Sequence, residues 1–510
     1  MKAFYLTTPL YYVNDVPHIG HSYTTIAADV LARWKRLRGE PVFFLTGTDE
    51  HGAKIAKAAE DSGETPQQLV DRVSGEFRRL WTALNITYDD FIRTSEPRHR
   101  AVVQKVFENL KDTGDLYKGT YEGWYCIHDE TYFAESELVE KKCPQCGRDV
   151  QKLKEDTYFF KLSKYEGPLL EHYRSHPEFL SPKHRANEII NFVKGGLRDF
   201  SVSRTRVKWG IPMPFDPDHT VYVWFDALLN YVTAAGYESD ARAFADRWPA
   251  DVHLVGKEIY RFHTVTWPAM LMALGLPLPK KVFAHGWWTV EGTKMSKSLG
   301  NVVDPHKMVA EYGVDAYRYF LLREVPFGSD GDFSEKALLN RYNTELANNL
   351  GNLLQRTTTL LTKNFGGEIP AANGAPALLS DIAAVVAQIE KHYADLAFGD
   401  VLETIFELLV RTNKFIDEQA PWKLGEADKP KLAGILNECV RTLRVAAILL
   451  APFMPQKCAE IWARLGERGT IEQAAPIWIS SLAKGTIPAF SSGQRVEKGD
   501  PLFMRKGGKS

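Results

Sequence analysis

The sequence predicts an α/β protein in which a strand-rich insertion interrupts a parallel sheet and a bundle of helices follows. Three observations predict it. A strand, a helix and a second strand follow one another at the N-terminus. The residue pattern changes near residue 113 and reverts near 220, and helical periodicity dominates beyond Ser334. Strand–helix–strand units build doubly wound parallel sheets, so a Rossmann-type domain is expected.

The first elements are predicted from their hydrophobic pattern. Residues 3–7 read as a short buried strand, and apolar residues recur at a helical period from Gly20 to Arg38. Gly39 is suited to end that helix, and a second buried strand follows at Val42–Leu45.

The middle of the chain differs and then returns to the first pattern. Aromatic residues, glycines, prolines and cysteines replace helical periodicity over residues 113–220, as expected of an inserted subdomain. A strand at Val252–Val255, a helical stretch at Glu258–Leu274 and a strand at Val282–His285 then resume the α/β pattern. Glu291-Gly292 is a two-residue turn signal that predicts a hairpin.

Helices are expected in most of the remaining chain. Three helices are predicted at 381–396, 400–418 and 430–450, and their short connections are typical of a helix bundle. Residues 485–510 are rich in Gly, Ser and Lys and are expected to be loose. One long amphipathic helix precedes these elements, marked by Leu346, Leu350, Leu353, Leu354, Leu360 and Leu361.

Composition narrows the class of protein. The net charge of −1 gives no overall field that would indicate a nucleic-acid partner, although a local basic patch would suffice. No apolar run approaches the ~18 residues of a membrane span, and the N-terminus lacks a signal-peptide core. The five cysteines do not resemble a disulfide framework. We expect a soluble, cytoplasmic protein.

Two histidines stand where the first loop meets the first helix, in the run His18-Ile19-Gly20-His21. Pro17 and the start of the helical period place both at the helix N-terminus, where free N–H groups and the helix dipole favour anions. Both imidazoles can face a triphosphate, and Gly20 lets a nucleotide lie against the backbone. Capping or metal-binding histidines would have the same spacing, so this motif alone leaves phosphate binding open.

A lysine-rich loop follows the predicted hairpin, in the run Lys294-Met295-Ser296-Lys297-Ser298. Lysine acts as a movable point charge for phosphate, so two cations beside small hydroxyl residues can close over a pyrophosphate. A solvated basic loop is the ordinary alternative.

Together and in this order, the motifs resemble the HIGH and KMSKS signatures of the class I aminoacyl-tRNA synthetases. The resemblance implies activation of an amino acid by ATP, with loss of pyrophosphate, and then transfer to the 3′ end of a tRNA. It implies that His18 and His21 meet phosphate charge, and that Lys294 and Lys297 meet the leaving pyrophosphate with Mg²⁺. These four are the expected catalytic residues. The residues that it assigns to ATP are His18, Gly20, His21, Gly256, Gly286, Lys294 and Lys297.

Longer stretches resemble the methionyl-tRNA synthetases: residues 7–21, 45–52, 222–231, 254–270, 283–298 and 330–334. The insertion is too small for the editing domain of synthetases for branched aliphatic amino acids. The resemblance implies that Asp49 holds the ammonium group of L-methionine, and aromatic walls suit a polarisable thioether. The family usually has Asp where this chain has Glu258. The resemblance places ten residues in or beside the side-chain pocket: Leu10, Tyr12, Trp224, Ala227, Leu228, Tyr231, Glu258, Phe262, His263 and Trp267.

The insertion carries Cys126-Ile-His-Asp129 and then Cys143-Pro-Gln-Cys146. The second half has zinc-knuckle spacing, whereas the first lacks its usual second cysteine. Methionyl enzymes often have paired cysteine motifs here, and some have lost the metal. We expect a structural Zn²⁺ on the three cysteines and Asp129, with His128 as the alternative fourth ligand and a metal-free knuckle as the alternative state.

The long C-terminal helix carries the expected tRNA contacts. Asn352 and Arg356 are four residues apart and share a face, and Trp422 follows Pro421 at a helix end. They match positions with which methionyl enzymes read the CAU anticodon. Unpaired anticodon bases can stack on an aromatic or guanidinium plane, which both Trp422 and Arg356 offer. Initiator and elongator methionine tRNAs are the expected partners.

The resemblance divides the chain into six parts. They are a catalytic domain in two halves (1–112 and 221–280) around the connective insertion (113–220), a stem-contact region with the KMSKS loop (281–334), an anticodon-binding all-α bundle (335–485) and a tail (486–510). Methionyl enzymes often dimerise through a further C-terminal domain. The sequence leaves no room for such a domain after the bundle, so we expect a monomer. The alternatives are a synthetase for another small amino acid such as cysteine, a tRNA-independent nucleotidyltransferase and a non-catalytic RNA-binding paralogue.

Overall fold

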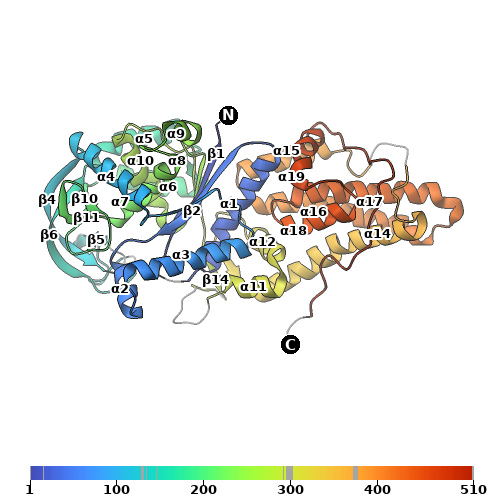
Figure 1. The fold of residues 1–510 in the computed structure, drawn as a ribbon, viewed down its shortest axis with the longest axis horizontal. Helices are drawn as coiled ribbons and strands as arrows, with labels where there is room; N and C mark the ends of the chain where they lie inside the picture. The colour runs from blue at the N-terminus through green and yellow to red at the C-terminus, as the bar shows by residue number, and fades with distance from the viewer. Residues whose placement is uncertain are drawn as a thin grey trace. The chain divides into compact units, whose positions relative to one another are not determined.

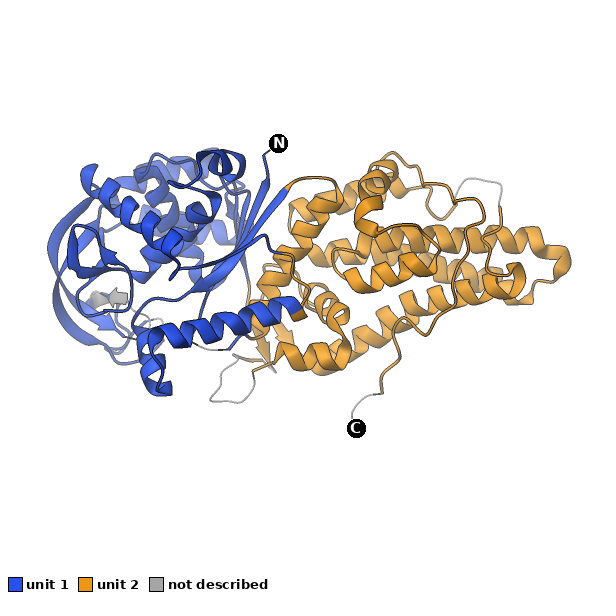
Figure 2. Cartoon of the chain, viewed as in Figure 1, with its two compact units in different colours: residues 1–17, 42–82, 88–285 blue, residues 18–41, 83–87, 286–510 orange. Residues whose placement is uncertain are grey.

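The structure is a computed structural model that forms two compact units (Figure 2). Unit 1 comprises residues 1–17, 42–82 and 88–285, and unit 2 comprises residues 18–41, 83–87 and 286–510. The residues that it describes are 2–14, 16–127, 131–133, 135–144, 146–290, 292–294, 302–371 and 377–507.

A six-stranded parallel sheet forms the centre of unit 1, in the order β3-β2-β1-β12-β13-β7. The predicted doubly wound sheet is confirmed, although its first two strands run further than the pattern indicated. The chain moves outward from β1 through β2 to β3, then returns to the other side of β1 with β12 and β13. The strands are β1 (Phe4–Tyr12), β2 (Val42–Asp49), β3 (Asp90–Arg93), β12 (Val252–Gly256), β13 (Val282–His285) and β7 (Leu180–Ser181).

Helices cover this sheet (Figure 1), and their apolar side chains pack against its strands. Phe107 of α4, Tyr231 of α8 and Trp267 of α10 belong to one buried cluster with the strand residues Tyr5 and Leu45. The helices of this part are α2 (Ala53–Ser62), α3 (Pro66–Ala83), α4 (Pro97–Asp112), α7 (Val223–Leu228), α8 (Asn230–Ala235), α9 (Ala241–Arg247) and α10 (Trp267–Ala273), with a 3-10 turn at Lys257–Ile259 and a π-helical turn at Phe262–Thr266.

The insertion is strand-rich, as predicted. Its long strands β4 (Leu116–Cys126) and β6 (Gln151–Phe160) pair antiparallel in a sheet of order β5-β4-β6-β8. The sequence pattern did not indicate two helices there, α5 (Glu166–Ser175) and α6 (Lys183–Lys194), nor that β7 between them joins the central sheet. The shorter elements are β5 (Thr131–Phe133), β8 (Phe200–Ser201), β9 (Ser203–Arg204), β10 (Pro212–Met213), β11 (Asp216–Val221) and 3-10 turns at Glu135–Glu137 and Leu162–Tyr165.

Unit 2 begins with α1 (Ile19–Leu37), the predicted first helix. It also contains a small sheet in which β14 (Trp288–Val290) pairs antiparallel with β15 (Thr293–Lys294) and parallel with β16 (Gly331–Phe333). The predicted hairpin is therefore confirmed. Two helices follow it, α11 (Pro305–Tyr312) and α12 (Val314–Arg323).

A buried ion pair joins α1 to α12 within unit 2. The guanidinium of Arg318 is fully buried, and its Nη2 lies 2.6 Å from Oδ2 of Asp29. The same group donates to the carbonyls of Leu84, Pro452 and Phe453. Burial would raise the pKa of Asp29, but Arg318 and Arg33 hold it below its usual value.

The C-terminal part is the predicted helix bundle, in which α16 and α17 lie side by side (Figure 1). The first long helix comprises α13 (Glu335–Arg341), a π-helical stretch at Tyr342–Gly351 and α14 (Asn352–Phe365). Two further helices, α18 and α19, were not predicted, because Pro452 and Pro455 read as a helix stop, whereas Pro455 opens α18. The other elements are α15 (Ile382–Ala394), α16 (Phe398–Gln419), α17 (Lys429–Leu450), α18 (Pro455–Arg464), α19 (Ile471–Leu482) and 3-10 turns at Pro421–Lys423 and Glu426–Asp428.

The expectation of a loose tail is wrong for the described residues up to 507. Val496 donates its backbone N–H to the carbonyl of Gly367 at 2.8 Å, and its side chain is buried. Lys506 and Asn343 exchange two hydrogen bonds. Leu502 and Phe503 are also buried, so a few apolar residues hold an otherwise polar segment against unit 2.

Over the residues that the structure describes, none of the helices combines the length and the hydropathy that crossing a bilayer requires.

Candidate active site

The strand order reverses beside β1, which is where open α/β sheets bind ligands, beyond the carboxyl ends of the strands. The longer strands carry the predicted residues to that edge. Tyr12 ends β1, Asp49 ends β2 and Gly256 ends β12. Three segments distant in sequence thus place candidate residues at one edge of the sheet.

The two histidines of the first motif cap α1. His18 is the N-cap residue, and its Nδ1 accepts the backbone N–H of Gly20 at 3.1 Å. His21 Nδ1 accepts the backbone N–H of His18 at 3.1 Å, which completes a reciprocal capping box. The capping role left open by the sequence is therefore present. A Cβ at Gly20 would lie 2.9 Å from Cε1 of His18, so the close ring requires glycine there.

These hydrogen bonds decide the tautomer of both rings. A backbone N–H can only donate, so each Nδ1 is unprotonated and a neutral ring carries its proton on Nε2. Burial and the neighbouring His18 hold the pKa of His21 well below its usual value, which keeps that ring neutral near pH 7. Each imidazole therefore has an Nε2–H donor, the group that a phosphate oxygen accepts from.

The hairpin before the lysine loop packs against α1. Tyr23, two residues after His21, meets the ring of Trp288 on β14 edge-on at a centroid distance of 5.6 Å. Asp332 on β16 accepts hydrogen bonds from the Thr289 hydroxyl at 2.7 Å and from the backbone N–H of Gly292 at 2.8 Å. The start of the lysine loop is thus tied to the helix that carries the histidines.

The described residues include only part of the second motif. The backbone of Lys294 pairs with Thr289, while Lys297 lies outside the described residues. Gly286 precedes β14, and a Cβ there would lie 2.2 Å from the carbonyl oxygen of Ser329. This glycine is required by a close backbone approach at the base of the hairpin.

The predicted aromatic residues form a connected group in unit 1. Trp224 and Phe262 stack with centroids 4.1 Å apart, and the Tyr231 hydroxyl lies 2.8 Å from His263 Nε2. His263 Nδ1 lies 3.0 Å from the carbonyl of Ile259, which can only accept, so Nδ1 carries the proton and Tyr231 donates to Nε2. In this arrangement the tyrosine proton points at histidine, and burial lowers the pKa of His263 to about 4.

Most of these side chains are buried, as core packing would also require. Ala227, Leu228, Tyr231, His263 and Trp267 are each less than a tenth exposed, whereas Leu10, Tyr12, Trp224 and Phe262 are half-buried. The structure therefore brings together five buried side chains and four that remain partly accessible to solvent.

Asp49 and Glu258 differ in their surroundings. Asp49 is 8% exposed at the end of β2, where its carbonyl accepts the N–H of Val13. Glu258 is exposed, and its carboxylate folds over Gly256, where a Cβ would lie 2.3 Å from Oε1. A side chain at position 256 would therefore have to displace the Glu258 carboxylate.

The knuckle cysteines converge. The Sγ atoms of Cys126, Cys143 and Cys146 all lie within 4.8 Å of one another, and those of Cys126 and Cys146 are 3.5 Å apart. Four sulfurs at ~2.3 Å around zinc would be roughly 3.8 Å apart, so the cluster fits this metal. Asp129 and His128 lie outside the described residues.

The predicted anticodon residues lie on one side of the bundle. Arg356 places its guanidinium carbon 5.0 Å from the ring centre of Trp422, which is half exposed. Arg356 Nη2 also pairs with Asp417 on α16 at 2.6 Å. Asn352 begins α14 one turn earlier and is exposed. The structure thus joins a cation and an aromatic ring from segments 66 residues apart in sequence numbering (422 − 356).

Sequence reasoning gave no role to Asp332, Glu50, His51 or Asp226. The first holds the hairpin, and the other three lie in buried hydrogen-bond networks. All four stand inside stretches that resemble the synthetases, and that position was the signal available in the sequence.

Comparison with known proteins places these features in a family. A family model described as tRNA synthetases class I (M) matches residues 4–155 and 149–358, and one described as the anticodon-binding domain of tRNA ligase matches residues 376–489. A methionine–tRNA ligase of Caldanaerobacter subterraneus subsp. tengcongensis is 51% identical over 99% of this chain and 79% of its own length. That of Bacillus subtilis is 47% identical over 99% of this chain and 78% of its own length.

A solved structure agrees with the sequence relatives. Mycobacterium tuberculosis methionyl-tRNA synthetase in complex with methionyl-adenylate has a TM-score of 0.93 and 41% identity, covering 99% of this chain and 100% of its own. With the sheet, the capped histidine helix and the helix bundle in place, the chain belongs to the methionyl-tRNA synthetases, in the class I tRNA synthetase family.

Proposed function

We propose that this chain is a methionine–tRNA ligase that activates L-methionine with ATP and transfers it to the 3′-terminal adenosine of methionine tRNA. One observation carries the proposal: 51% identity to a methionine–tRNA ligase over 99% of the chain. The capped histidines and the methionine-type sequence stretches support it.

In the activation step, a carboxylate oxygen of methionine attacks the α-phosphorus of ATP, and the bond to pyrophosphate breaks. The chain contributes charge and position rather than a nucleophile. We assign the Nε2–H groups of His18 and His21 to phosphate oxygens, and Lys294 and Lys297 to the leaving pyrophosphate. Mg²⁺, when bound with ATP, neutralises part of the phosphate charge. Gly20, Gly256 and Gly286 are also assigned to ATP, which would meet their backbones.

The amino-acid assignments follow the same logic. Asp49, nearly buried at the end of β2, is assigned to the methionine ammonium. The side chain of methionine is assigned to the aromatic group around Trp224, Phe262, Tyr231 and His263, because a polarisable thioether packs well against ring edges and faces. The remaining residues assigned to this pocket are Leu10, Tyr12, Ala227, Leu228, Glu258 and Trp267.

We assign a structural Zn²⁺ to Cys126, Cys143 and Cys146, with Asp129 or His128 as the fourth ligand. When bound, this metal would link the segment around Cys126 to the segment that carries Cys143 and Cys146. The close sulfur cluster supports the assignment. Metal analysis of the purified protein should give about one zinc per chain, and Cys143→Ser should lower it sharply; an unchanged zinc content would rule out these ligands.

The tRNA assignments rest on the bundle. Asn352, Arg356 and Trp422 are assigned to the anticodon, with the tRNA 3′ end meeting the catalytic part. The division into catalytic halves 1–112 and 221–280, insertion 113–220, stem-contact region 281–334, bundle 335–485 and tail 486–510 is part of the same proposal. A single species of 57.7 kDa in sedimentation velocity is the test of the expected monomer.

The decisive experiment is ATP–pyrophosphate exchange with each of the twenty amino acids, followed by charging of purified methionine tRNA. Methionine should support exchange far above the others, with weak exchange by analogues such as norleucine, since apolar pockets separate one methylene by only ~1–3 kcal/mol. Exchange with cysteine or leucine in place of methionine would overturn the proposal. Exchange without tRNA charging would favour a tRNA-independent nucleotidyltransferase.

A further inference from the structure

The residues on either side of Asp49 are held by buried hydrogen bonds. Thr48 donates its hydroxyl to Glu50 Oε1 at 2.8 Å, and the carbonyl of Glu50 accepts the indole N–H of Trp209 at 2.6 Å. His51 Nδ1 lies 2.6 Å from Asp226, whose other oxygen lies 2.7 Å from His99. Asp49 therefore stands in the middle of a short segment with fixed neighbours.

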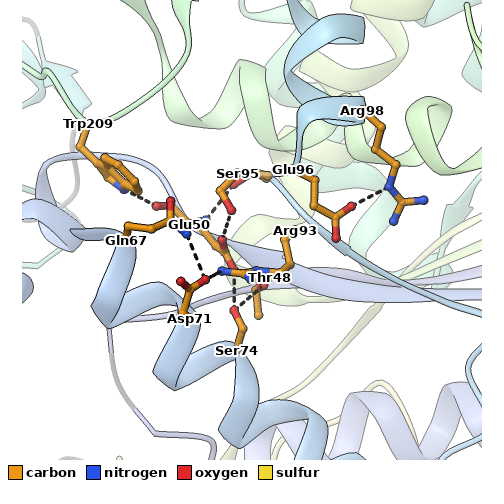
Figure 3. A network of polar contacts seen from close by, with 11 residues as sticks. Thr48, Glu50, Gln67, Asp71, Ser74, Arg93, Ser95, Glu96, Arg98 and Trp209 are labelled. Atoms are coloured by element: carbon orange, nitrogen blue, oxygen red, sulfur yellow. Dashed lines mark hydrogen bonds and ion pairs between the residues drawn. The ribbon is translucent and has the colours of Figure 1, made fainter. Parts of the chain in front are cut away.

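Glu50 is the centre of the larger of these networks (Figure 3). Its side chain is fully buried, and Oε1 accepts a hydrogen bond from Arg93 Nε at 2.7 Å. Ser74 of α3 also donates to Oε1, and Ser95, just after β3, donates to Oε2. The carboxylate thus binds side chains from two other segments of unit 1.

The backbone of Glu50 is held as well. Its N–H, which belongs to the peptide group that follows Asp49, donates to the Thr94 hydroxyl at 2.9 Å. Arg93 in turn pairs with Asp71 of α3 at 2.5 Å, which connects the buried carboxylate to the surface (Figure 3). Both the side chain and the main chain of Glu50 are therefore fixed at the point where β2 ends.

Stability alone is a weak reason for such an arrangement. A buried carboxylate carries a desolvation penalty, and well-packed apolar residues of similar volume often stabilise a protein equally or better. What a network of directed hydrogen bonds supplies in addition is a defined geometry, and a recognition group must be held within about 0.5 Å to act well.

We infer that Glu50 is a positioning residue for amino-acid recognition: its buried hydrogen bonds to Arg93, Ser74 and Ser95 fix the end of β2 and thereby set the Asp49 carboxylate to receive the substrate ammonium. The inference rests on the proposed function, in which Asp49 binds the ammonium group of methionine.

Two variants loosen this network without removing Asp49. Ser95→Ala deletes the donor to Oε2 and leaves the bonds to Oε1 in place. Glu50→Gln keeps the shape of the side chain and an oxygen for the three Oε1 donors, but removes the charge that faces Arg93. Each should raise the methionine KM in pyrophosphate exchange by roughly 10-fold or more, as expected of a displaced binding group. The ATP KM and kcat should stay within about twofold of the original values.

The controls separate positioning from general damage. Arg98→Ala removes a cation that pairs with Asp90 and Glu96 at the edge of the same region. Among the described residues, Arg98 makes no hydrogen bond to Glu50, so this variant should leave the methionine KM unchanged. Ser95→Thr restores a hydroxyl and should restore the KM. A loss of kcat with an unchanged methionine KM in Ser95→Ala and Glu50→Gln would indicate a purely structural role and overturn the inference.

Asp49→Asn separates the positioning role of Glu50 from the assignment of Asp49 to the substrate ammonium. If it raises the methionine KM while Ser95→Ala and Glu50→Gln do not, Glu50 is not a positioning residue and the proposed function stands. If Asp49→Asn itself leaves the KM unchanged, the assignment of Asp49 is wrong and the inference falls with it.

Discussion

The histidines of α1 each use Nδ1 to cap the helix, and the proposed function assigns their Nε2 to phosphate oxygens. In both His18 and His21, Nδ1 accepts a backbone N–H, and the proton of the neutral ring is on Nε2. His263 has the opposite tautomer, because its Nδ1 faces a carbonyl. The residue type alone does not give this information, which comes from the hydrogen-bond partners.

Substitution of His21 by two amides should separate its two roles. Asparagine places a polar atom near the position of Nδ1, and glutamine places one near Nε2. His21→Asn should therefore keep the cap but slow pyrophosphate exchange by roughly 10²–10³-fold. His21→Gln should retain more activity, and because glutamine at the third helical position also suits a capping box, neither variant should lose much stability. Exchange rates and thermal unfolding measure the two effects, and equal slowing of exchange in the two variants would contradict the assignment of Nε2 to the reaction.

Asp315 of α12 is a buried carboxylate with an unusual titration. Its Oδ2 accepts the backbone N–H of Lys457 at 2.6 Å, and it is 3% exposed. Burial raises the pKa of Asp315 to about 6, against the opposing effects of the Lys457 N–H and the Arg318 charge. The folded protein therefore binds a proton between pH 4 and 6 that the unfolded chain does not.

The sign of the pH dependence follows. The contribution of Asp315 to stability is full below its unfolded pKa, declines as pH rises to about 6, and is then lower by roughly 3 kcal/mol. Asp315→Asn can still accept the Lys457 N–H and does not titrate. It should raise the melting temperature more at pH 7.5 than at pH 4.5, whereas Glu407→Gln at an exposed site should act alike at both. An equal shift from Asp315→Asn at the two pH values would refute this.

Among the elements, the long helix of the bundle carries its residues to a cation–aromatic contact. Arg356 of α14 lies over Trp422, which follows α16, and pairs with Asp417. The guanidinium is thus held beside an aromatic face that is half exposed. Such a pair can stack an unpaired base on its exposed side.

Replacing this pair should impair only the tRNA step. Arg356→Ala and Trp422→Ala should each cost ~1–3 kcal/mol in tRNA recognition, seen as a 10- to 100-fold loss in charging efficiency. Methionine-dependent pyrophosphate exchange should be unchanged. Arg411→Ala, which removes an exposed arginine paired with Asp381 in the same bundle, is the matched control and should affect neither. A parallel loss of exchange in Arg356→Ala would contradict an anticodon role.

Across the whole molecule, the elements that could be predicted from the sequence are those whose apolar residues recur at a regular period. The parallel strands, α1 and the long helices follow from hydrophobic spacing, and the hairpin follows from Glu291-Gly292. Elements without such a signal were missed. β7 has two residues, and α18 opens with a proline that reads as a stop.

The site residues show the same limit. Motif order and resemblance supplied the histidines, Asp49 and the aromatic group. They could not supply the partners of Glu50 or the bond from His51 to Asp226, because those bonds join residues up to 175 positions apart and depend on tertiary packing. The tail was misjudged for a similar reason, since four buried residues, Gln494, Val496, Leu502 and Phe503, outweigh its polar composition.

The short strand β7 has a consequence for protein engineering. It is contributed from within the inserted region, yet it forms the outer strand of the central sheet beside β13. Excising the insertion to obtain a minimal enzyme would remove that strand. The backbone N–H and C=O groups of β13 would then be unpaired at the edge of the sheet, where they can pair with another chain and cause aggregation. A shortened version should therefore keep α5, β7 and α6 and trim only the hairpin formed by β4 and β6.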